Sequence, residues 1–73
     1  MDEKTLKALL IKENPEFRRA ADEHQTCERE LEEIRAKYLP TEADTLMERE
    51  IKKRKLALKD RMYTIMLEYR NKA

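Results

Sequence analysis

His24 and Cys27 are the side chains in this sequence best suited to binding a metal. They are three positions apart, so on a helix they lie on one face. Two copies meeting at a twofold axis would supply two imidazoles and two thiolates, a ligand set that zinc accepts. The alternative is that both residues fill a helix-packing seam, because one chain supplies only half of such a site. We favour the packing interpretation and expect no metal and no cofactor.

Catalysis has less support still. The chain has one His and no Gly, so it lacks the Gly-shaped loops that cradle phosphates and a paired acid and base to activate a nucleophile. Its carboxylates belong to long charged segments that are typical of solvated helix faces. We therefore expect that the protein is not an enzyme.

A basic block between Arg49 and Arg61 is the feature that would suit a large anionic partner. Its lysines and arginines could contact phosphates. No aromatic residue interleaves with the block for base stacking, and the net charge of the whole chain is only +1. The candidate nucleic-acid contacts are Lys52, Lys53, Arg54, Lys55 and Lys59.

Composition predicts the elements that carry these residues. Charged residues make up 45% of the 73 positions, and the absence of Gly disfavours hairpin turns between strands. Two prolines divide the chain into expected helices over 3–12, 15–38 and 41–70. Asn14 is suited to cap the second helix with Pro15 in its first turn, and Thr41 to cap the third. The connection Leu39-Pro40-Thr41 is short enough to force an antiparallel return.

A seven-residue repeat of apolar residues predicts the face along which the two long helices pack. The first helix also places Ala20 and Tyr38 on this seam, and Met47 is expected to fill it in the second. Lys55 and Glu48 interrupt the second repeat. The predicted seam residues are Phe17, His24, Cys27, Leu31, Ile34, Ile51, Leu58, Met62, Ile65 and Tyr69.

Charge supports the same pairing. Between Glu13 and Glu33 there are eight acids and three bases, whereas between Arg49 and Arg61 there are seven bases and two acids. An antiparallel hairpin brings these opposite charges alongside each other. The short first helix, with Leu6, Leu9 and Leu10, either docks on this hairpin or frays.

The stretch from Lys52 to Tyr63, KKRKLALKDRMY, resembles the basic Leu-x-Leu-Lys-Asp signature of the YdcH-like family. These are small bacterial helical-hairpin proteins, grouped as a domain of unknown function. The first-helix stretches NPEF at 14–17 and EHQ at 23–25 are similar to that family's motifs. Cys27 and Glu48 depart from its pattern, where apolar residues such as Leu are usual. The resemblance implies a two-helix fold and self-association, and it implies no catalytic residues.

Taken together, the sequence predicts a single all-α domain over residues 1–73, an antiparallel, coiled-coil-like two-helix hairpin with a short N-terminal helix. We expect it to form a homodimer with a four-helix bundle, because two helices leave Leu46 and Leu56 uncovered. The longest apolar run, residues 8–11, is too short to span a membrane, and the lone cysteine is typical of a cytoplasmic protein. The expected role is self-association or binding of an unknown protein partner. The alternative is non-specific association with RNA or ribosomes.

Overall fold

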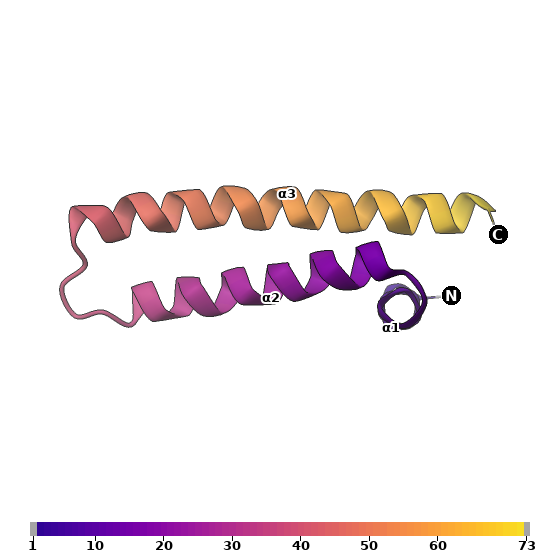
Figure 1. Ribbon diagram of the computed structural model, residues 1–73, viewed down its shortest axis with the longest axis horizontal. Helices are drawn as coiled ribbons and strands as arrows, with labels where there is room; N and C mark the ends of the chain where they lie inside the picture. The colour runs from indigo at the N-terminus through magenta and orange to yellow at the C-terminus, as the bar shows by residue number, and fades with distance from the viewer. Residues whose placement is uncertain (1, 73) are drawn as a thin grey trace.

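The computed structural model describes residues 2–72, which form three helices. They are α1 (Glu3–Glu13), α2 (Pro15–Arg35) and α3 (Glu42–Lys72). The two long helices run antiparallel and side by side, while α1 crosses the open end of the hairpin (Figure 1). The body measures 49 × 19 × 16 Å. The prediction of an all-α hairpin with a short N-terminal helix is confirmed.

A single residue, Asn14, separates α1 from α2 and caps both. Its backbone N–H donates to the carbonyl of Leu10 at the end of α1, at 2.8 Å. Its side-chain oxygen accepts from the backbone N–H of Phe17 in the first turn of α2, at 3.0 Å. Pro15 follows as the first residue of α2, where its missing N–H costs no hydrogen bond. The corner therefore forms without Gly, and it turns α1 across the hairpin.

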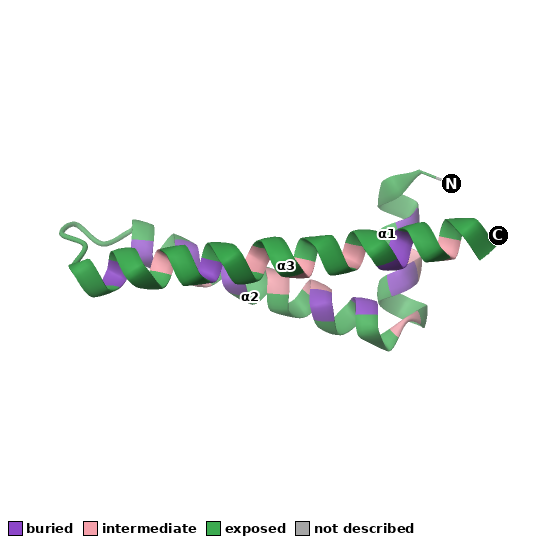
Figure 2. Ribbon diagram, turned by 90° about the horizontal axis from the view of Figure 1, so that it is seen from above, coloured by how far each residue is buried: buried purple, intermediate pink, exposed green. Residues whose placement is uncertain are grey.

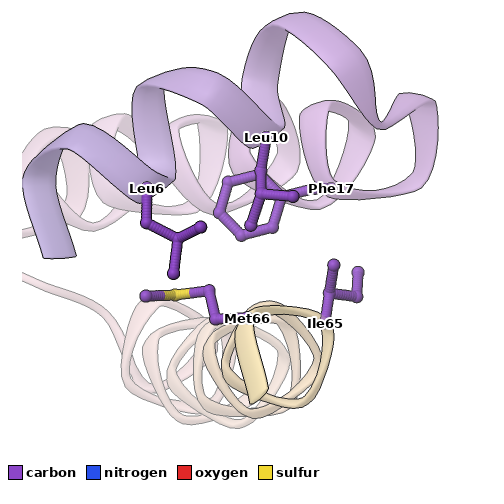
Figure 3. Close-up of a cluster of buried hydrophobic side chains, with 5 residues drawn as sticks. All are labelled: Leu6, Leu10, Phe17, Ile65 and Met66. Carbon is purple, nitrogen blue, oxygen red and sulfur yellow. The ribbon is translucent and has the colours of Figure 1, made fainter. Parts of the chain in front are cut away.

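Two separate apolar clusters hold the helices together. One lies near the middle and the turn end of the hairpin, with Cys27, Leu31, Ile34 and Ile51 buried and Leu58 packed beside them. The other lies at the open end and joins all three helices. Its buried members are Leu6 and Leu10 from α1, Phe17 from α2, and Ile65 and Met66 from α3 (Figure 3).

The docking of α1 settles the alternative that the sequence left open. Leu6 and Leu10 are 1% and 2% exposed, and they lie over Phe17 and Met66 (Figure 3). Burying two leucines provides the apolar area that an isolated 11-residue helix lacks. The helix is therefore docked within the chain, and it covers the end of the seam.

The reversal differs from the expected one at its start. Helix α2 ends at Arg35, three residues before Tyr38, and Ala36 serves as its C-cap. Tyr38 therefore lies in the connection with 94% of its surface exposed, so its predicted place on the seam is wrong. Met47 is also wrong as a seam residue, being 56% exposed, because the end of α2 meets α3 through Arg35 with Glu48 and Ile34 with Ile51 instead.

Candidate interaction surface

The predicted seam residues fall into two groups by burial. Phe17, Cys27, Leu31, Ile34, Ile51 and Ile65 are buried, and His24, Leu58, Met62 and Tyr69 are half-buried at its edges. Lys55 and Glu48, the two charged residues that interrupt the seven-residue repeat of α3, form ion pairs with residues of α2. The Lys55 ammonium lies 3.3 Å from the Glu28 carboxylate, and the Glu48 carboxylate lies 3.4 Å from the Arg35 guanidinium. The two interruptions of the repeat thus become cross-helix ion pairs.

His24 and Cys27 lie on one face of α2 as expected, but their surroundings differ. Cys27 is a free thiol in the apolar cluster, whereas the His24 side chain is 22% exposed. His24 Nδ1 is 3.9 Å from a Glu28 carboxylate oxygen, which is too far for a hydrogen bond. Among residues 2–72, no three His, Cys, Asp or Glu side chains are grouped so that they could hold a metal ion.

The five bases proposed for nucleic-acid contact are divided among several environments. Lys55 pairs with Glu28 on α2, and Lys52 pairs with Glu48 one turn before it, at 3.3 Å. Within residues 2–72, Lys53, Arg54 and Lys59 form no ion pair. Consecutive residues on a helix point about 100° apart, so residues 52–55 point to all sides of α3. They do not form one stripe that could follow a phosphate backbone.

The turn contains a buried polar residue, Asp44, that the sequence analysis did not single out. Asp44 is buried, and its carboxylate accepts from the Lys37 ammonium at 2.7 Å and from the Thr41 backbone N–H at 2.9 Å. The Thr41 hydroxyl accepts in return from the Asp44 backbone N–H, which completes a capping box. The Lys37 contact, followed by the Thr41 N–H, lowers the pKa of Asp44 to about 2. Asp44 therefore links the connection after α2 to the first turn of α3.

The side of α3 turned away from α2 exposes large apolar side chains. Leu56 is 60% exposed, Tyr63 60% and Leu67 40%, and they follow one another at spacings of seven and four residues. At 100° per residue they lie within about 40° of each other around the helix, and about 150° from the seam. Figure 2, seen from the α3 side, shows this surface as mostly exposed. We call these three residues the outer α3 stripe.

Two shallow recesses flank the stripe and share Leu56 as a wall. One, of about 470 Å³, runs toward the turn and is lined by Arg49, Lys52 and Lys53. The other, of about 290 Å³, lies in the corner between α1 and the hairpin and has an apolar floor that includes Met62, Tyr63 and Met66. Sequence reasoning named Leu56 as an uncovered residue but missed Tyr63 and Leu67. Their spacing from Leu56 is the signal that would have found them.

The model of a family described as a protein of unknown function, DUF465, matches residues 17–66. The chain belongs to the DUF465 family. The resemblance to the YdcH-like family is thereby confirmed, and the DUF465 match covers nearly all of α2, the turn and α3 as far as Met66. No curated protein and no solved structure matches the chain.

The DUF465 match includes both sides of α3. Its range contains the seam except Tyr69 and two of the three stripe residues, while α1, Leu67 and Tyr69 lie outside it. The family description assigns no activity. Within residues 2–72, no helix is both long enough and apolar enough to cross a bilayer.

Proposed function

We propose that this protein is a non-enzymatic interaction module that binds another helix through the outer α3 stripe. The single observation that supports this most directly is the exposure of Leu56 and Tyr63 on a helix whose opposite face is already buried. An amphipathic helix has one apolar face, and α3 has two. The second face has no packing role within residues 2–72, and it is available to a partner.

The sequence predicts a second copy of the chain as that partner, and self-association remains one form of the proposal. Two observations weaken it. The short helix α1 is already docked on the hairpin, and its Leu10 is buried by contacts within the chain rather than left for a second copy. The stripe is also flanked mainly by bases, so two copies paired through it bring like charges together. Sedimentation equilibrium from micromolar to millimolar concentration tests this form directly, and a single 8.9 kDa species throughout contradicts it.

Association with RNA is the second candidate, and the unpaired Lys53, Arg54 and Lys59 favour it. Phosphate contacts with several bases would make binding fall steeply with salt. However, Lys52 and Lys55 are engaged by acids within the chain. An RNA-binding function also leaves the apolar stripe without a role, and for this reason we rank it second.

Affinity capture from the native cell extract, with and without nuclease, tests the proposed function. The bait is compared with a stripe variant, Leu56→Gln with Tyr63→Gln. The matched control carries the same kind of change at exposed apolar residues in the turn, Tyr38→Gln with Leu39→Gln. The expected result is a discrete, nuclease-resistant protein that the stripe variant loses and the control retains. Recovery that is nuclease-sensitive, or equal for all three baits, contradicts the proposal.

A further inference from the structure

We propose, on the basis of that interaction role, that the outer α3 stripe binds an acidic amphipathic helix of a different protein. The stripe runs from Leu56 to Leu67, which is about 16 Å or three helical turns. A ligand helix of that length would place its own apolar residues over Leu56 and Tyr63. The recess between α1 and the hairpin, about 290 Å³ in volume, would receive a side chain from one end of the ligand helix.

The hairpin contains a working example of this kind of binding. Helix α2 is an acidic amphipathic helix, and α3 binds it through apolar packing flanked by ion pairs. Glu16 pairs with Arg61, and Glu28 pairs with Lys55. The outer side of α3 repeats the arrangement, with an apolar stripe at helical spacing between rows of bases. The same chemistry that holds α2 on one side of α3 is therefore present, and unused, on the other.

Charges beside the stripe define the ligand. Lys52, Lys59 and Arg70 lie along one side of it, and Arg49 and Lys53 along the other. Two acids, Asp60 and Glu48, lie among them, and Glu48 lines the same recess as Lys52. Lys52 is paired with Glu48, whereas the remaining four bases form no ion pair within residues 2–72. A helix with Glu or Asp beside its apolar seam would neutralise both rows.

A second copy of this chain fits the stripe poorly. If α3 packs on the α3 of a second copy, in either direction, the four bases of each copy that form no ion pair within residues 2–72 meet the same four bases, with Asp60 and the Lys52-bound Glu48 as the acids on each copy. If it packs on the exposed side of a second α2, the charges match but the apolar contact is missing. Within 15–35 no large apolar side chain is exposed. The stripe needs acidity and an apolar seam on the same exposed helix, and no exposed helix face of this chain offers both.

Binding to synthetic helical peptides tests the inference on the full chain. The probe is a peptide of about 21 residues with Leu at the a and d positions and Glu at e and g, and the matched peptide has Lys at e and g. Amide spectra of the chain locate binding, and fluorescence anisotropy of labelled peptide measures it. We expect the acidic peptide to shift amides from Leu56 to Leu67 while those of Leu31 and Ile51 on the seam stay in place.

Variants separate the parts of the interaction. Leu56→Gln with Tyr63→Gln is expected to weaken the acidic peptide about tenfold or more, since apolar anchors dominate helix docking. The turn control, Tyr38→Gln with Leu39→Gln, leaves binding unchanged. Lys53→Gln with Lys59→Gln weakens binding and flattens its decline with salt. Each variant is expected to keep its helicity, because all these positions are exposed. Circular dichroism checks this.

Several results would overturn the inference, and they differ from a failure of the proposed function. Equal binding of both peptides removes the preference for acid but leaves helix docking intact. If neither peptide binds while a captured protein still depends on the stripe, the ligand is not a helix of this kind. A dimer that the stripe variant abolishes makes a second copy the occupant. Binding of an RNA oligonucleotide that needs Lys53 and Lys59 but not Leu56 replaces the partner helix by phosphate.

Discussion

Leu31 lies in the middle of the hairpin seam, and its truncation to Ala measures what that seam contributes to stability. The side chain is 2% exposed and lies among Cys27, Ile34 and Ile51. Replacing a core Leu by Ala buries less apolar surface and leaves a cavity, which lowers the free energy of unfolding by about 2–5 kcal/mol. A two-helix seam is narrow and can partly close around a void. We therefore expect a loss near the lower end, about 3 kcal/mol.

That loss is large for a chain of this size. At about 0.05–0.15 kcal/mol per residue, the whole chain has a free energy of unfolding of about 4–11 kcal/mol. A loss of about 3 kcal/mol lowers the Tm by roughly 12–24 °C. Urea denaturation followed by helical circular dichroism at low micromolar concentration measures the change in free energy.

Leu56→Ala is the matched control, because it makes the same substitution on the exposed side of α3. Leu56 is 60% exposed, so little burial is lost, and Ala is the better helix former. We expect less than about 0.5 kcal/mol. If both variants lose equal stability, Leu56 is buried in solution and the exposed stripe is wrong. A loss below about 1 kcal/mol for Leu31→Ala would refute the seam itself.

Three further outcomes follow from contacts elsewhere in the chain. Leu10→Ala should release α1 and remove hydrogen-exchange protection from residues 3–13, while α2 and α3 stay protected. An equal loss of protection in all three helices would contradict separate docking of α1. Because the pKa of Asp44 is lowered to about 2, its contribution to stability is present above about pH 4 and is lost as pH falls through 2. A carboxyl titration of Asp44 by NMR near its ordinary value would disprove the Lys37 contact. Glu28→Gln should cost less than about 1 kcal/mol at low salt and almost nothing in about 1 M salt, as measured by urea denaturation.

The sequence predicted the helices and most of the buried seam because those features depend on local spacing. Asn14 and Thr41 cap helices as their types suggest, and the seven-residue repeat marks the buried residues of α2 as far as Ile34. The repeat misplaced Tyr38, because periodicity describes which side a residue would take on a helix and does not say where that helix ends. Beyond the end of α2, Lys37 reaches Asp44 across the turn, a contact between segments that spacing rules do not relate.

The docking of α1 and the outer α3 stripe were not predicted from the sequence, for a related reason. Leu6 and Leu10 suit either a docked or a frayed helix, and only their burial against Phe17 and Met66 in the assembled chain decides between the two. Tyr63 was read as part of a basic family signature. Tyr63 is recognised as an exposed apolar residue only once α2 is packed on the opposite side of α3, because exposure depends on how the helices are assembled.

The crosswise placement of α1 also brings the start of this helix to the same end of the hairpin as the end of α3. Both the start of α1 and the end of α3 lie at the open end of the hairpin, far from the turn (Figure 1). A donor dye near one end and an acceptor near the other would therefore report directly on whether α1 is docked. A ligand that wedges into the corner between α1 and the hairpin would change that transfer efficiency, even if the long helices did not move. The arrangement of the helices therefore allows binding at this corner to be followed as a change in one distance, that between the start of α1 and the end of α3.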